Sequence, residues 1–148
     1  ETHPYEAVDY ERVHKENVNH NIGMWMMGEL SSAMNEKDVL LFVKNTMKTD
    51  CIRHSAFINK KIKKVAVLGG SGSFAISNAR KAGADAYLSA DFKYHEFFDA
   101  ENKIVIADIG HYESEQFTKD LIYDLLVKNF TKFAVRLSKV NTNPIKYL

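Results

Sequence analysis

The amino-acid sequence predicts an α/β fold in which a mostly parallel, mixed sheet carries flanking helices. Two observations support this prediction. Short runs of apolar, often β-branched residues alternate with longer segments of helical periodicity from Asn35 onward. Glycine or polar residues follow three of the apolar runs, as they do where a parallel strand leads into a helix. Such alternation is typical of a parallel sheet with right-handed crossovers.

Composition limits the class of protein. The chain has 148 residues, of which 45% are hydrophobic and 26% charged, which is ordinary for one globular domain with a sizeable core. A net charge of +1 favours neither nucleic acid nor a membrane surface as a partner. The single cysteine, Cys51, rules out an internal disulfide, and no apolar stretch approaches the ~20 residues of a membrane span. We expect a cytoplasmic protein without membrane contact.

The chain divides into two parts by its patterning. Residues 1–21 are polar with little periodicity, and we interpret them as a linker or the tail of a preceding inserted domain. Residues 22–148 form the α/β lobe. The first residue is Glu1 rather than methionine, so we expect the sequence to be a piece of a longer protein.

The first elements follow from apolar patterning. Ile22–Leu30 is a methionine-rich apolar run that predicts a strand. Asn35 is a better helix cap than Ser31 or Ser32. The helix that it starts should end near Thr49, with a buried face of Val39, Leu40, Phe42 and Val43.

The elements after this helix alternate regularly. Cys51–Phe57 predicts a short strand, and Lys64–Leu68 a second strand that is buried on both faces. Gly83 is placed to end a helix over Phe74–Ala82. The remaining expected elements are strands over Ala86–Ala90, Ile104–Ala107 and Phe133–Leu137, helices over Tyr94–Asp99 and Tyr112–Asn129, and a turn-rich tail over Asn141–Pro144. The long helix has an apolar stripe of Phe117, Leu121, Leu125 and Leu126.

His111 and Glu115 are the candidate metal ligands. They follow an apolar strand and a glycine, and a helix that begins at His111 places the two residues one turn apart on one face. An imidazole and a carboxylate in that arrangement can reach one divalent cation. The alternative is a solvated pair on an exposed helix face. Asp108 is a candidate hydrogen-bond acceptor that would orient the His111 ring. Glu113, in the first turn of this helix, is expected to interact favourably with the helix dipole.

Two further strand ends carry candidate residues. Gly70, Ser71, Gly72 and Ser73 lie in a glycine-rich turn whose N–H groups could bind a phosphate or other anion of a cofactor, or which is simply a tight turn that needs positive φ. Asp91 and His95 are candidate catalytic residues that face substrate, or alternatively a helix cap and a solvated histidine. Because parallel strands end at one sheet edge, we expect these segments and His111–Glu115 to line one cleft.

Four motifs resemble the Nif-three-like family, whose members are labelled GTP cyclohydrolase 1 type 2 homologues. They are His3-Pro4-Tyr5-Glu6, Gly69-Gly70-Ser71-Gly72-Ser73, Asp91-Phe92-Lys93-Tyr94-His95 and the segment from Gly110 to Gln116, in the family's order. Ala90 and Trp25 depart from the family pattern. The resemblance implies an α-β-(βα)₃ layout, with the Ile22–Leu30 or the Cys51–Phe57 strand antiparallel at an edge.

The resemblance also implies a function. It implies the C-terminal portion of a dinuclear metal-binding, hydrolase-like protein, with two divalent metals per full-length subunit and a nucleotide-like substrate such as GTP. In the family, His and Asp residues from the N-terminal half complete the metal site, so we expect His111 and Glu115 to form an incomplete site here. Alternatives are a ring-forming scaffold that binds a protein or nucleic acid, and a flavodoxin-like nucleotide-binding module. We expect a homo-oligomer. The cluster of Met24, Trp25, Met26 and Met27 is either part of the core or a contact between subunits.

Overall fold

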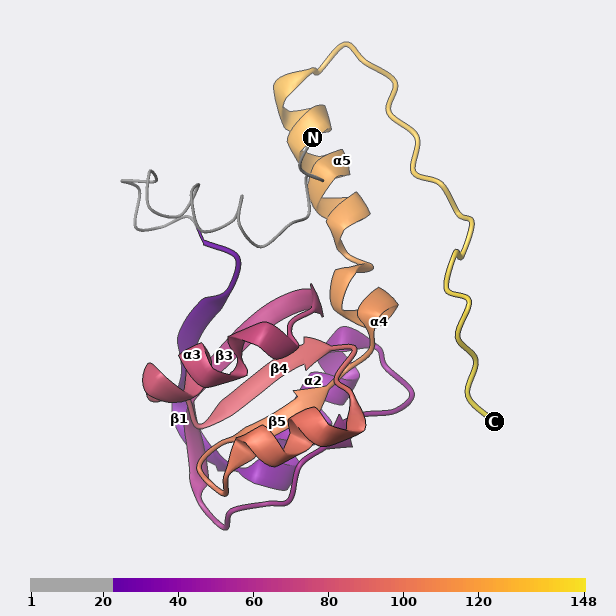
Figure 1. Ribbon diagram of the computed structural model, residues 1–148. Coiled ribbons are helices and arrows are strands. Elements are labelled where there is room, and N and C mark those ends of the chain that lie inside the picture. Colours follow the sequence, from indigo (N-terminus) through magenta and orange to yellow (C-terminus); the bar gives the residue numbers. More distant parts are fainter. Residues whose placement is uncertain (1–22) are drawn as a thin grey trace, which may run out of the picture.

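A five-stranded mixed sheet is the centre of the fold in the computed structural model, which describes residues 23–148 (Figure 1). The strand order is β1-β3-β4-β5-β2, in which β3 (Lys61–Ser71), β4 (Ala86–Ala90) and β5 (Val105–Asp108) are parallel. The two edge strands, β1 (Met26–Asn35) and β2 (Arg53–His54), are antiparallel to their neighbours. This arrangement confirms the predicted fold class. The predicted linker over residues 1–21 lies outside the described residues.

The helical elements connect and cover these strands. They are α2 (Glu36–Met47), η1 (Ser73–Ala75), α3 (Ile76–Lys81), η2 (Tyr94–Ala100), α4 (His111–Glu115) and α5 (Thr118–Asn129). Asn35 is the N-cap residue of α2, as predicted. Gly83 follows α3 with a φ of +81°, in the left-handed region that favours glycine after a helix. In the part of the chain that the structure describes, no helix is long and apolar enough to cross a membrane.

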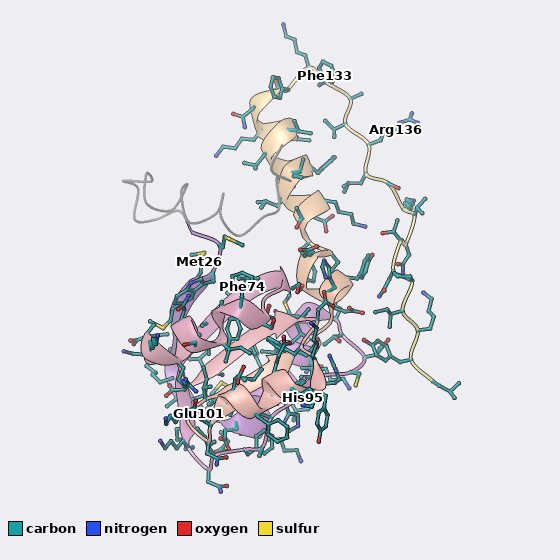
Figure 2. The ribbon with its side chains drawn as sticks, viewed as in Figure 1. Met26, Phe74, His95, Glu101, Phe133 and Arg136 are labelled. Atoms are coloured by element: carbon teal, nitrogen blue, oxygen red, sulfur yellow. The ribbon has the colours of Figure 1, made fainter. Side chains whose placement is uncertain are left out.

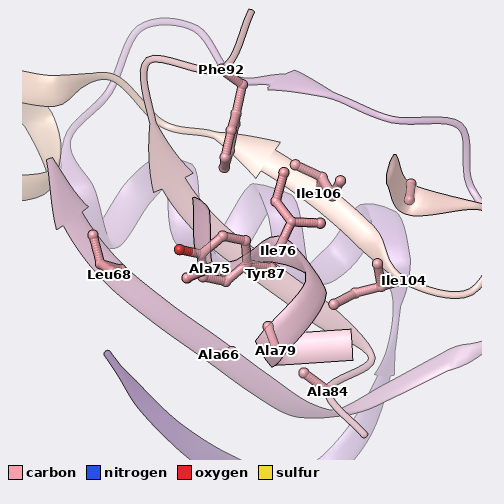
Figure 3. Close-up of a cluster of buried hydrophobic side chains, with 11 residues drawn as sticks. Ala66, Leu68, Ala75, Ile76, Ala79, Ala84, Tyr87, Phe92, Ile104 and Ile106 are labelled. Carbon is pink, nitrogen blue, oxygen red and sulfur yellow. The ribbon is translucent and has the colours of Figure 1, made fainter. Parts of the chain in front are cut away.

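The sheet has a separate apolar core on each face. Successive residues of a strand point to opposite faces, so Tyr87 and Ile106 pack with α3 and η2, whereas Leu88 and Ala107 pack with α2. Figure 3 shows the first of these cores, in which Ile76 of α3 lies among strand residues. Each fully buried large apolar side chain contributes about 1.5–3 kcal/mol. These two cores fix the strand ends that carry the candidate site.

The prediction that β3 is buried on both faces is wrong. Its buried and exposed residues alternate, and Val67 is 43% exposed. The physical reason is incomplete cover on the α2 side, where Val67 and Phe42 line an apolar cavity of about 360 Å³. Phe42 is exposed for the same reason, although the pattern of α2 predicts it to be buried with Val39.

The strand predicted over Cys51–Phe57 is shorter than expected. Only Arg53 and His54 pair with β5, through Asp108 and Ala107. The ladder ends after His54. The Ser55 N–H still donates to the Ile106 carbonyl at 2.9 Å, but Oγ of Ser55, and not its carbonyl oxygen, accepts from the Ile106 N–H at 3.0 Å.

The C-terminal third contains two corrections. The helix predicted over Tyr112–Asn129 is two helices, α4 and α5, separated by a turn at Gln116 and Phe117. The Gln116 side chain donates a hydrogen bond to the carbonyl of Met47 at 2.7 Å. This bond ties the end of α4 to α2, and α5 then projects away from the sheet (Figure 1). The strand predicted over Phe133–Leu137 is absent, because this segment lies beyond α5 with no strand beside it. The expected apolar stripe of α5 is therefore unburied.

Candidate functional site

Three polar side chains meet where β4 and β5 end. Nδ1 of His111, the first residue of α4, lies 2.6 Å from Oδ2 of Asp91, which directly follows β4. Nε2 of the same ring lies 3.4 Å from Oε2 of Glu115, one helical turn further along α4. Each of the three side chains is about half exposed. The imidazole of His111 therefore stands between two carboxylates, with one ring nitrogen toward each.

Asp91 reaches His111 because of its backbone conformation. Its φ of +59° lies in the left-handed region, which aspartate tolerates better than most residues. The sequence interpretation paired Asp91 with His95 and assigned the orientation of His111 to Asp108. The second assignment is wrong: Asp91, not Asp108, bonds the His111 ring.

The buried Asp108 has a structural role instead. Its carboxylate forms an ion pair with Arg53 and accepts hydrogen bonds from the backbone N–H groups of Phe92 and Gly110, both at 3.1 Å. These bonds hold the segment after β4 against the segment after β5. Asp108 thereby fixes the positions from which Asp91 and His111 reach one another. The sequence carried no signal for Arg53, because its partner lies 55 residues away and pairs only through the sheet.

Gly70 of β3 lies beside the side chains of Glu115 and His111. Its φ is +70°, and a Cβ there would lie 2.5 Å from Oε1 of Glu115 and 3.4 Å from Cε1 of His111. Its N–H donates to Oγ of Ser114 at 2.8 Å, which joins the end of β3 to α4. Glycine at this position leaves the space that the Glu115 carboxylate occupies.

The rest of the glycine-rich turn is bonded within the protein. The carbonyl oxygens of Gly70 and Gly72 accept hydrogen bonds from Ser89 Oγ at 3.0 Å and from Tyr87 Oη at 2.8 Å. A Cβ on Gly72 would collide with both of these side chains. Gly70 has the positive φ that the tight-turn alternative requires, but Gly70 and Ser71 lie within β3, whose register with β4 shifts between Val67 and Ser71. The anion-binding role of Gly70, Ser71, Gly72 and Ser73 stays a prediction.

His95 is not joined to this group. It lies on η2 with an exposed side chain, and its ring meets that of Tyr94 edge-on at 5.2 Å between centroids. Within residues 23–148, no hydrogen bond or ion pair links His95 to Asp91 or His111. The structure thus brings together Asp91, His111, Glu115 and Gly70, and the catalytic role of His95 stays a prediction.

Glu113 also differs from expectation. The sequence places it as a helix-dipole residue, but its side chain is buried and accepts a hydrogen bond from Nδ2 of Asn143 at 2.9 Å. The C-terminal tail thereby lies against α4. It closes one side of a cavity of about 580 Å³ that is also lined by His111, Glu115 and α5.

The electrostatics of the group centre on His111. The hydrogen bond that Nδ1 of His111 donates to Asp91 raises the pKa of His111 above its ordinary value, partial burial lowers it, and the charges of both carboxylates raise it further. An imidazole and a carboxylate are ligands for a divalent cation. Among residues 23–148, however, no group of three or more His, Cys, Asp or Glu side chains is arranged to hold a metal ion.

Comparison with known proteins decides the family. The sequence profile of the Duf34/NIF3 (NGG1p interacting factor 3) family matches residues 4–144. The chain belongs to the Duf34/NIF3 family. Among the similar curated Duf34/NIF3 proteins, one from Bacillus subtilis is 34% identical over 99% of this chain and one from Staphylococcus epidermidis is 30% identical over 99%. Both are named "GTP cyclohydrolase 1 type 2 homolog".

Solved structures of the Duf34/NIF3 type share the fold. The Staphylococcus aureus protein SA1388 matches with a TM-score of 0.74 and 28% identity, over 85% of this chain and 37% of that one. A Bacillus cereus protein related to NIF3 matches with a TM-score of 0.72 and 27% identity, over 85% of this chain and 36% of that one. This Duf34/NIF3 chain spans about two-fifths of the length of the curated relatives that it matches.

Proposed function

We propose that this chain is the metal-binding C-terminal lobe of a Duf34/NIF3 hydrolase-like enzyme that acts on a nucleotide-like substrate. The single observation that carries the proposal is the row Asp91–His111–Glu115 at the ends of two adjacent parallel strands. The names of the relatives, GTP cyclohydrolase 1 type 2 homologues, support the substrate class.

His111 and Glu115 offer two of the ligands that a divalent cation needs. A proton on Nδ1 of His111, donated to Asp91, leaves the lone pair of Nε2 on the side of the Glu115 carboxylate. A ligating imidazole that is fixed in this way by an outer carboxylate is a common arrangement in metal sites. A bound cation would supply Lewis-acid polarisation of a substrate oxygen. His111 and Glu115 would hold it, and further ligands would have to come from outside this pair.

The other residues would have distinct tasks. Asp91 acts as a positioning residue that fixes the tautomer and the orientation of His111. Gly70 keeps space free for Glu115. His95, on the neighbouring η2, is proposed to face substrate and exchange protons with it, since an imidazole can act as a general acid or base.

The test is zinc or manganese titration of the purified chain by calorimetry, followed by elemental analysis after dialysis. We expect loose binding by the chain and none by His111→Ala or Glu115→Gln. The matched control is His54→Ala, because His54 is exposed and lies on β2. Unchanged metal affinity of His111→Ala in the calorimetric titration would refute the proposal.

A second candidate function is a scaffold that assembles with copies of itself, and one observation favours it. Helix α5 has no buried residue, and it exposes Leu121, Ile122, Leu125 and Leu126. Contiguous apolar surface of this kind marks association sites in proteins. Of these four residues, Ile122 lines the cavity that His111 and Glu115 also line, whereas Leu121, Leu125 and Leu126 lie outside it.

A further inference from the structure

A second concave surface lies between β2 and η2. It is a cavity of about 670 Å³ lined by Arg53 and His54 on one side and by three aromatic residues of η2, Tyr94, Phe97 and Phe98, on the other. We call it the η2 pocket. Figure 2 labels His95 and Glu101, which lie near the two ends of η2. Its size is within the range of small-molecule sites.

Two of the three aromatic side chains that line the η2 pocket are largely exposed to solvent. Tyr94 is 72% exposed and Phe98 67% exposed, and their rings meet edge-on at 5.7 Å between centroids. Phe97 is partly buried and packs edge-on against the buried Phe92 at 5.8 Å. The wall is therefore anchored in the core through Phe97, while Tyr94 and Phe98 offer aromatic surface to solvent.

On the polar side of the η2 pocket, Arg53 is held in place by its neighbours and its charge is compensated. The Arg53 guanidinium lies 5.5 Å from the Phe97 ring centroid, and its charge is compensated by the buried Asp108. One nitrogen of Arg53 makes the bonds to Asp108 and to the carbonyl of Phe92, and its other N–H groups have no partner among residues 23–148. Glu101, at the rim, is paired with Arg80 and Lys103.

His54 supplies a hydrogen-bond acceptor beside this donor. Its Nδ1 lies 2.7 Å from the carbonyl oxygen of Ser55, to which it donates. In the neutral ring, Nε2 is then an acceptor. Nε2 also has no partner within the described part of the chain.

We propose that the η2 pocket binds a planar, uncharged nitrogen heteroaromatic ring. Such a ring stacks face-on against one of Tyr94 and Phe98 and meets the other edge-on, because these two rings are nearly perpendicular. It offers an acceptor to Arg53 and a donor to His54. An anionic ligand would gain little electrostatic attraction from Arg53, because Asp108 already compensates the charge of Arg53. An aliphatic ligand leaves the two polar side chains without partners, which costs binding free energy. The proposal uses neither a metal nor His111, so it stands independently of the proposed function.

The experiment is an NMR titration of the whole chain with adenosine, in the presence of EDTA so that no metal contributes. Ribose is the matched probe that lacks the ring. We expect adenosine to shift the ring resonances of Tyr94 and Phe98 in a saturable way, and ribose to leave them unchanged. Equal shifts with both probes, or none with adenosine, would overturn the proposal.

Variants separate stacking from general apolar contact. Tyr94→Leu and Phe98→Leu keep apolar bulk but remove a ring, and we expect each to weaken adenosine binding about tenfold, in the range of alanine effects on base stacking. Tyr94→Phe keeps the ring and should bind as the parent does. Phe74→Leu is the control, since Phe74 is an exposed phenylalanine outside the η2 pocket.

The result against the proposal is equally clear. Because Tyr94 and Phe98 are exposed, their replacement should leave the fold intact, which the amide spectrum verifies. If Tyr94→Leu and Phe98→Leu retain adenosine affinity but alter the sedimentation coefficient, the surface is a contact between copies and the proposal is wrong.

Discussion

Asp91 and His111 are 20 residues apart in the chain, yet their side chains form a 2.6 Å hydrogen bond across the ends of two adjacent strands. The bond leaves Nε2 of His111 on the side of Glu115. It is the relationship on which the metal proposal rests, and it predicts how the pair titrates.

Replacing Asp91 with Asn should lower the pKa of His111. The hydrogen bond that His111 donates to Asp91 is the largest cause of the raised pKa, so its loss moves the titration back toward the ordinary value of 6.5. The measurement is the pH dependence of the His111 ring protons by NMR. His95→Asn is the control, and an unchanged His111 titration in Asp91→Asn would contradict the assignment.

The same shift predicts how stability depends on pH. A pKa that is raised by folding means that the folded chain binds the proton more tightly than the unfolded chain. The stabilisation is then fully present below pH 6.5 and is lost as pH rises through the pKa of folded His111. Because the pair is half exposed, we expect less than about 1 kcal/mol. Urea unfolding at several pH values, compared between the parent and Asp91→Asn, measures it.

Gly70→Ala should destabilise the chain and disturb Glu115. The added Cβ would meet Oε1 of Glu115 at 2.5 Å, and the φ of +70° strains any residue with a side chain. We expect a loss of about 1–3 kcal/mol in the free energy of unfolding. Gly28→Ala is the matched control, because a Cβ there meets nothing within 4 Å and φ is not positive. Equal stability of the two variants would show that Gly70 is not constrained.

Asp108→Ala should be among the more destabilising changes in the sheet. It leaves the buried N–H group of Phe92 without its acceptor, at about 1–3 kcal/mol, and also removes the acceptor of the part-buried Gly110 N–H group and the partner of Arg53. We expect a total loss of at least about 2 kcal/mol in denaturant unfolding. Asp124→Ala, on the exposed surface of α5, should change stability little. A small effect of Asp108→Ala would contradict its structural role.

Replacing Leu121 and Leu125 with Ser should reduce self-association of the purified chain. Both side chains are at least half exposed on α5, so the change removes apolar surface without opening the core. Sedimentation velocity over a range of concentrations measures the effect, and Asp124→Ser is the control on the same helix. If the double variant associates as strongly as the parent, the contact lies elsewhere, for example at Met24 and Met26.

Some of the candidate site was predictable from local spacing. His111 and Glu115 are one turn apart at the start of a helix, and a four-residue spacing alone places them on one face. Asp91 was identified as a candidate, but its partner was not. Whether Asp91 or Asp108 reaches His111 depends on the left-handed backbone at Asp91 and on the Arg53 partner of Asp108, and local spacing encodes neither.

The sequence by itself determined the α/β class, the β4 strand over Ala86–Ala90 and the strand-end positions of the glycine-rich turn and His111, because these depend on local periodicity and on glycine. Only the tertiary structure decided which of the apolar segments are buried and which are exposed. The stripe of α5 and the run over Phe133–Leu137 have the composition of buried elements, but no neighbour covers them in the described residues. Burial needs a partner surface, and a one-dimensional pattern states only that a residue can be buried.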